Sequence, residues 1–164
     1  MPNGYIKSKI QEDIVLDNQD YGSKRILEIS SIDEIYKRIV SCPANAETTV
    51  VHFKQVSGAA GGAVKFDGAL DIQDVRYIRV TNLDSSNSLT LSLQAEVGED
   101  DSGADASASI LLEAGKSFMM GSGHDGIGVS DANANIVTDL VDLDSLVVQP
   151  GSNAISVEVF VASV

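Results

Sequence analysis

The sequence holds two histidines, and one of them, His124, is followed directly by Asp125. A histidine hydrogen-bonded to a carboxylate is the usual arrangement of a general base, so this pair is the first candidate for catalysis. Side chains of adjacent residues point apart, and the pair lies in a glycine-rich stretch, which favours a histidine in a surface loop. The other histidine, His52, stands between Val51 and Phe53 and is typical of a residue on a sheet face or in an interface. Neither histidine predicts a catalytic site.

Acidic residues are concentrated in the segment 99–105, and carboxylate oxygens are ligands that calcium prefers. Their spacing does not match the twelve-residue calcium loop, so we interpret the segment as a solvated acidic loop and leave calcium binding open. The stretch 121–126 matches GxGxxG by letters, without the strand–helix–strand unit that a nucleotide-binding loop requires. We therefore expect no catalytic, cofactor-binding or metal-ligating residue, and the chain is not predicted to be an enzyme.

The charge of the chain argues against two classes of partner. Its 164 residues include 24 acidic and 11 basic side chains, giving a formal net charge of −13. Such a surface repels phosphate backbones and anionic lipids, so we expect neither nucleic acid nor a membrane as partner. Four cations near the start, Lys24, Arg25, Lys37 and Arg38, fit either an ordinary solvated surface or a positive arm that meets an acidic neighbour. Cys42 is the only cysteine and no apolar leader is visible, which indicates synthesis in a reducing cytoplasm.

Apolar and polar residues alternate along most of the chain, a pattern that predicts half-buried β-strands. The clearest case is 154–162, where Ile155, Val157, Val159 and Val161 share one face. Further strands are expected at 14–16, 24–29, 48–55, 75–83, 89–95, 109–113, 116–120, 136–142 and 145–149.

The strands 75–83 and 89–95 are separated by five turn-forming residues, Asp-Ser-Ser-Asn-Ser. Asp, Asn and Ser side chains stabilise such turns by bonding the local backbone. Two strands joined in this way are typical of an antiparallel hairpin, and we expect one here.

The segment 31–40 has two interpretations. Ser31 and Glu34 match a capping box, and Ile32, Ile35 and Ile39 follow helical spacing, which favours a short helix. The same segment also fits a strand with Ile35, Lys37 and Ile39 on one face. The sequence leaves this choice open.

These elements predict an all-β fold: a single antiparallel β-sandwich, jelly-roll-like, or a barrel of about ten short strands, with one short helix near 31–40 if the capping box acts. The expected sandwich domain covers 24–164. Residues 1–23 are expected to form an N-terminal arm that orders on a neighbour, or an ordinary first strand.

Part of the chain, about 70–164, resembles small β-sandwich structural proteins from the virions of tailed bacteriophages, especially marine phages and cyanophages. The resemblance lies in a strand ending in Thr-Asn-Leu-Asp at 81–84, a second strand at 89–93, Leu-Glu-Ala-Gly at 112–115 before an apolar strand, and a valine-rich strand at 157–161. Proteins of this kind decorate or cement the capsid or form parts of the tail or neck, as symmetric multimers. They offer no catalytic residues to carry over.

The resemblance implies a non-catalytic virion protein that decorates and stabilises the capsid shell. The alternative is a tail, neck or fibre module that binds a host surface glycan or another tail protein. Expected partners are other virion proteins, namely the major capsid protein or tail proteins, and further copies of the chain, with a trimer as one form. The protein would be made in the host cytoplasm and located in the virion. Its position on the virion, its symmetry and its partner surface are left open.

Overall fold

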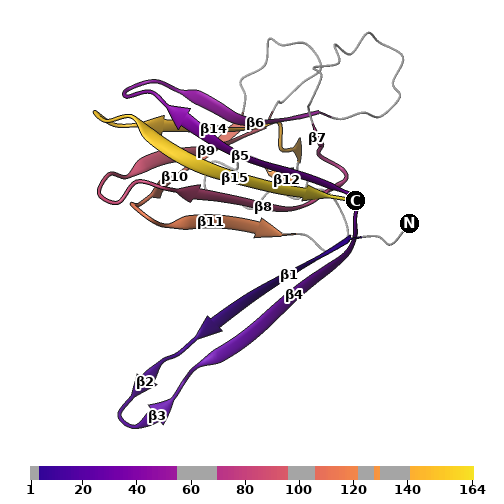
Figure 1. The fold of residues 1–164 in the computed structure, drawn as a ribbon, viewed down its shortest axis with the longest axis vertical. Helices are drawn as coiled ribbons and strands as arrows, with labels where there is room; N and C mark the ends of the chain where they lie inside the picture. Colours follow the sequence, from indigo (N-terminus) through magenta and orange to yellow (C-terminus); the bar gives the residue numbers. More distant parts are fainter. Residues whose placement is uncertain (1–3, 55–69, 96–105, 122–127, 130–140) are drawn as a thin grey trace.

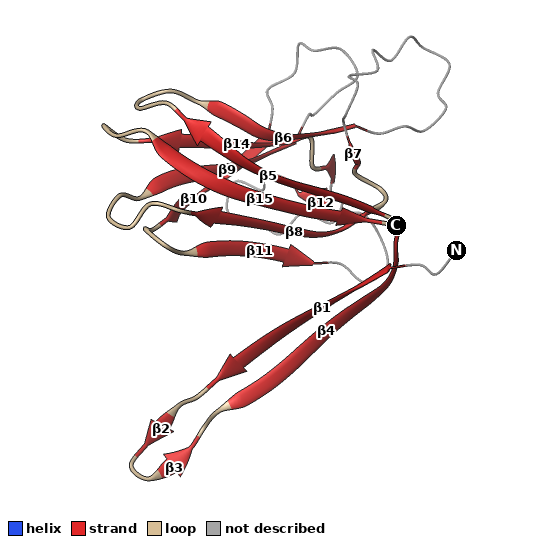
Figure 2. Cartoon of the chain, in the orientation of Figure 1, coloured by secondary structure: helices blue, strands red, loops and turns tan. Residues whose placement is uncertain are grey.

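The computed structural model describes residues 4–54, 70–95, 106–121, 128–129 and 141–164. Regular structure within these ranges consists of β-strands, and the strands form open sheets rather than a closed barrel, as Figures 1 and 2 show. The all-β prediction and its sandwich alternative are thereby confirmed, and the helix near 31–40 is not formed.

Two sheets pack face to face. The five-stranded sheet has the order β10 (Ala106–Leu112), β9 (Leu89–Ala95), β14 (Ser145–Pro150), β6 (Thr48–Lys54) and β7 (Leu70–Asp71). The four-stranded sheet has the order β11 (Ser117–Gly121), β8 (Val75–Asn82), β15 (Ile155–Ser163) and β5 (Glu34–Cys42). The pairs are antiparallel except β6 with β7, which run parallel.

Three further pairings complete the described strands. β1 (Gly4–Glu12) pairs with β4 (Ser23–Ile32), β2 (Val15–Leu16) with β3 (Gln19–Asp20), and β12 (Gly128–Val129) with β13 (Val141–Asp142). Most of the expected strand 136–142 lies outside the described residues.

The core follows from the alternation in the sequence. The predicted inward face of β15 is buried, with Ile155, Val157, Val159 and Val161 at 2% exposure or less. On the opposite sheet, the alternate residues of β9 are buried in the same way. Because period-two patterning places alternate side chains on one face, each sheet contributes one apolar face to a shared interior.

The expected hairpin between 75–83 and 89–95 is wrong. β8 pairs with β11 and β15, whereas β9 pairs with β10 and β14, so the two strands belong to different sheets. The turn itself is formed as predicted, since Asp84 Oδ1 accepts hydrogen bonds from the backbone N–H groups of Ser86 and Asn87, both at 2.8 Å. β8 and β9 each carry one apolar face, which fits either a hairpin within one sheet or a corner at which the chain passes from one sheet to the other. The apolar faces of the two strands are both buried between the sheets, and this arrangement requires the corner.

The segment 31–40 forms no helix: Ser31 and Ile32 end β4, and the residues from Glu34 onward belong to β5. β5 pairs with β15 over nine residues, from Ser163 opposite Glu34 to Ile155 opposite Cys42. The edge of β15 offers a full hydrogen-bonding ladder, which outweighs the local capping box. Ile35 and Ile39 lie on the outer face at 57% and 66% exposure, in the alternation expected for the strand interpretation.

A buried asparagine holds one end of the sandwich together. Asn82, at the end of β8, has no exposed surface. Its Nδ2 donates to the backbone oxygens of Asn87 at 2.8 Å, Leu112 at 3.2 Å and Glu113 at 3.2 Å, and its Oδ1 accepts from Asp84 N at 2.9 Å. One side chain therefore ties the corner after β8 to the end of β10 and the turn that follows it.

Candidate functional site

The most distinctive feature of the fold is a long hairpin that projects from the sandwich. We call residues 4–32 the arm; it consists of β1 and β4 with β2 and β3 near its end (Figure 1). Residues 13–22 are called the tip, and residues 4–12 and 23–32 the stem. From Gly4 to Asp17 the chain spans 13 residue steps, so the arm is about 40 Å long at ~3.3 Å per residue.

The sequence of the arm encodes a tight hairpin. Its turn is Asp17–Asn18, with φ of 51° and 61°, flanked by the pair Leu16–Gln19. Two central residues with positive φ make a type I′ turn, whose twist suits an antiparallel hairpin, and Asp and Asn tolerate this backbone conformation better than most residues. The register continues unbroken from this turn down to Tyr5 opposite Ser30.

A small second core fixes the root of the arm to the outer face of the four-stranded sheet. Ile29 and Ile32 from β4 are buried there with Tyr77 and Ala162, and Ile6 packs against them. The rings of Tyr77 and Phe160 meet edge to face with centroids 6.0 Å apart. Burial of these side chains sets the direction in which the arm leaves the sandwich.

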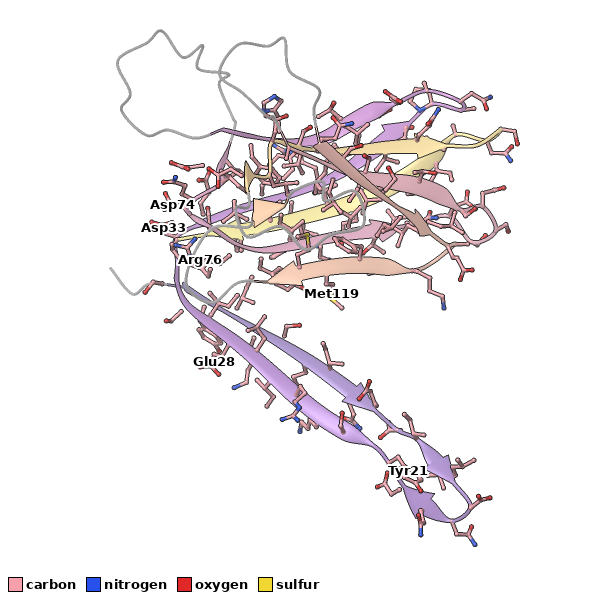
Figure 3. The ribbon with its side chains drawn as sticks, turned by 180° about the vertical axis from the view of Figure 1, so that it is seen from behind. Tyr21, Glu28, Asp33, Asp74, Arg76 and Met119 are labelled. Carbon is pink, nitrogen blue, oxygen red and sulfur yellow. The ribbon has the colours of Figure 1, made fainter. Side chains whose placement is uncertain are left out.

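Beyond the root, the arm and the sheet flank two adjoining hollows that are open to solvent, and we call these together the arm cleft. One has a volume of about 240 Å³ and the other about 350 Å³, and Ser8 and Tyr77 line both. Figure 3 shows Met119, from β11, on the side of the sandwich that the arm overhangs. The remaining lining residues are Ile6, Lys7, Lys9, Ile10, Arg25, Ile26, Leu27, Arg79, Met120, Gly121 and Phe160.

Gly121 permits the close approach of arm and sheet at the cleft. A Cβ added at this position would lie 2.9 Å from Leu27 Cδ2 and 3.6 Å from Tyr77 Cδ2. Atoms do not approach a real Cβ so closely, so only glycine fits here without displacement of Leu27. The cleft is therefore narrow on the side of β11.

An ion pair on the outer face of the sheet positions Arg79, one of the cations of the cleft. Arg79 Nη2 donates to Glu158 Oε1, and Lys37 Nζ lies 3.4 Å from Glu158 Oε2. Arg79 Nη1 also donates to Thr81 Oγ1 at 2.9 Å. The hydrogen bond from Arg79, with the charges of Arg79 and Lys37, holds the pKa of Glu158 below its usual value.

This ion pair predicts a pH-dependent contribution to stability. Glu158→Gln is expected to lower the free energy of unfolding by about 0.5–1 kcal/mol at neutral pH, because the side chain is only partly exposed. A carboxyl with a depressed pKa stabilises the fold above its unfolded-state pKa and loses that effect as pH falls through its folded-state pKa. Measured by urea unfolding, the free energies of unfolding of the parent chain and Glu158→Gln should differ at pH 7, and this gap should close at pH 3. Glu113→Gln, at an exposed residue, should show no such gap. A gap of equal size at both pH values would contradict the expectation.

Exposed apolar side chains are concentrated on the arm. Of thirteen large apolar residues exposed in the described part of the chain, eight lie between residues 4 and 32. Four of these belong to the tip, with Ile14, Val15, Leu16 and Tyr21 at 50% to 73% exposure. Tyr21 can be located on the projecting end of the arm in Figure 3. An isolated two-stranded hairpin is at best marginally stable in water, so this surface is suited to burial against another molecule.

The candidate residues singled out in the sequence do not converge on the arm. His52 lies in β6, where Nδ1 is 2.8 Å from Phe53 O and Nε2 is 3.9 Å from Asp144 Oδ1. His124, Asp125, the acidic segment 99–105 and the stretch 121–126 (apart from Gly121) lie outside the described residues. Among the residues that the structure does describe, no group of three or more His, Cys, Asp or Glu side chains is arranged to hold a metal ion.

The cationic stretch noted in the sequence is divided by the fold. Lys24 and Arg25 lie on the stem of the arm, whereas Lys37 and Arg38 lie on β5. The sequence predicts an arm or a first strand over residues 1–23 and a sandwich domain over 24–164. In the structure, β1 on one side of this boundary pairs with β4, which begins at the boundary itself, so the arm is a hairpin that the sequence did not predict. The available signal was Asp17–Asn18 between apolar stretches, a two-residue turn signal.

Comparison with known proteins gives no assignment: no family model, curated protein or solved structure matches the chain. No helix within the described ranges is long and apolar enough to cross a membrane.

Proposed function

We propose that this chain is a non-catalytic structural protein of an assembled particle, and that the arm attaches it to neighbouring subunits. The observation that carries the proposal is the projecting hairpin with its apolar tip. A two-layer sandwich of this size has its own core, and the arm, about 40 Å long from root to turn, projects beyond it. Such a length suits contact with a neighbouring subunit rather than with the chain's own sandwich.

The energetics support attachment through the tip. Full burial of a large apolar side chain contributes about 1.5–3 kcal/mol, so four tip residues could together offset much of the entropy lost on association. The arm cleft supports a non-catalytic role, because the lining residues that the structure describes include no histidine, cysteine or carboxylate. Backbone groups along the edges of the arm offer further hydrogen bonds to a partner strand.

The particle we propose is the virion of a tailed bacteriophage, with the chain decorating and cementing the capsid shell. The support is the resemblance across β8, β9, β11 and β15, together with the arm. In this role the sandwich would rest on the shell and the arm would reach an adjacent subunit. Cementing requires one molecule to hold two subunits at once, which a compact body with one long extension can do.

The proposal is tested with the full chain in two assays. Sedimentation velocity over a range of concentrations measures self-association, and co-sedimentation with phage particles that lack this protein measures attachment. We expect concentration-dependent oligomers or saturable particle binding, and higher thermal stability of the decorated particle. A strictly monomeric chain that also fails to bind particles would overturn the proposal.

A further inference from the structure

Charge is separated along the arm. The tip carries three aspartates, Asp13, Asp17 and Asp20, and no basic residue. The stem carries four basic side chains against two acidic ones; the basic residues are Lys7, Lys9, Lys24 and Arg25. The arm therefore has an acidic, apolar tip and a basic stem.

The cations of the stem are only partly neutralised within the chain. Lys7 Nζ pairs with Glu28 Oε2 at 2.9 Å, whereas Lys9, Lys24 and Arg25 make no ion pair with any described residue. The tip aspartates likewise have no cationic partner there: Asp13 accepts from Gln11 Nε2 and Asp20 from Gly22 N. Both charged groups are thus available to another molecule.

The arm cleft matches the tip in composition. Its apolar surface comes from Ile10, Leu27, Tyr77 and Met119, and its cations are Lys7, Lys9, Arg25 and Arg79. Among the described residues that line it there is no carboxylate, although the chain contains 24 acidic residues. An occupant that carries apolar side chains next to carboxylates would bury its apolar side chains on this surface and pair its carboxylates with these cations.

The tip cannot fill the cleft of its own chain. The cleft lies beside residues 8–10 and 25–27, and the turn at Asp17 is about eight residue steps, or ~25 Å, farther along the hairpin. Both strands keep one register over this distance, and the arm points away from the sandwich (Figure 1). A second copy of the chain, in contrast, brings a matching tip.

We propose that the tip of one copy occupies the arm cleft of a second copy. The inference rests on the proposed function and specifies one partner for the arm. Each chain donates one tip and accepts another, so the contact joins two different surfaces and repeats until a ring closes or a filament forms. Two chains of net charge −13 repel each other at long range. Salt at physiological concentration screens charges that are more than about 8 Å apart, so the short-range pairing of tip and cleft charges determines whether the chains associate.

The experiment is a charge swap in the full chain. The tip variant is Asp13→Lys with Asp20→Lys, which keeps the Asp17–Asn18 turn; the cleft variant is Lys9→Glu with Arg25→Glu. Each variant alone is expected to self-associate about tenfold more weakly than the parent chain, because like charges then meet. Mixed in equal amounts, the two variants should associate again, since a basic tip meets an acidic cleft and an acidic tip meets a basic one.

A matched control for the tip variant makes the same change in net charge away from the arm. Glu47→Lys with Glu113→Lys alters two exposed residues and should leave association unchanged. Thermal melts of every variant check that the sandwich is folded. If the mixture stays dissociated, or the parent chain does not self-associate, the inference is overturned. If the parent chain nevertheless binds phage particles through its arm, the proposed function stands with a different partner for the tip.

Discussion

Shortening the arm is expected to abolish association while leaving the sandwich folded. Deleting residues 9–16 and 19–26 places the native Asp17–Asn18 turn directly between Ser8 and Leu27. This pair has the same register and face as the native flanking pair, because eight residues are removed from each strand. The variant loses every tip residue except the turn Asp17–Asn18, including all four apolar ones, and keeps the root cluster with Ile6 and Ile29.

We expect sedimentation velocity of this variant to show monomer at concentrations where the parent chain forms oligomers, and particle binding to fall below detection. Its free energy of unfolding should change by no more than about 1 kcal/mol, because the buried core is untouched. The control is Leu83→Ser with Leu111→Ser, which removes exposed apolar side chains outside the arm and should not alter association. Association of the shortened chain at the parent affinity would remove the arm from the mechanism.

Asn82→Leu is expected to give the largest loss of stability from a single substitution among those considered. The leucine is of similar size but removes the donor to the oxygens of Asn87 and Leu112 and the acceptor for Asp84 N. Leaving a buried polar group without a partner costs about 1–3 kcal/mol, so we expect a total of about 3–4 kcal/mol, or a fall in Tm of roughly 10 °C. Urea unfolding and differential scanning calorimetry measure these quantities.

Asn153→Leu serves as the matched control, because Asn153 is exposed and bonds only the side chain of Asn87, at 3.1 Å, among the contacts seen for it. Its effect should stay within about 0.5 kcal/mol. Equal effects of the two substitutions would mean that the hydrogen bonds of Asn82 do not hold the corner together.

The sequence predicted the strands better than their partners. Alternation fixes which side chains of a strand face inward, and β15 shows the face expected from Ile155, Val157 and Val159. Which strands lie side by side in a sheet depends instead on which strand edges meet once the two sheets have packed together. The turn at 84–88 was therefore correctly expected as a turn and wrongly interpreted as the loop of a hairpin.

Local signals also failed where a long-range ladder competed with them. The capping box at Ser31 and Glu34 acts within one turn of helix, whereas the edge of β15 pairs with β5 along its full length. The arm cleft was beyond sequence reasoning for a similar reason. Lys9 and Arg25 line adjoining hollows only because the hairpin pairs β1 with β4, with Ile10 opposite Arg25 and Lys9 opposite Ile26.

The single thiol of the chain has a practical consequence. Cys42 has no exposed surface, and burial raises its pKa, so little reactive thiolate forms at neutral pH while the fold is intact. Maleimide dyes will therefore spare it and react with a cysteine introduced at Ser30, an exposed residue of the stem that lies outside the tip and does not line the arm cleft. Fluorophores attached there to separate molecules allow energy transfer to report how far one labelled arm lies from the next.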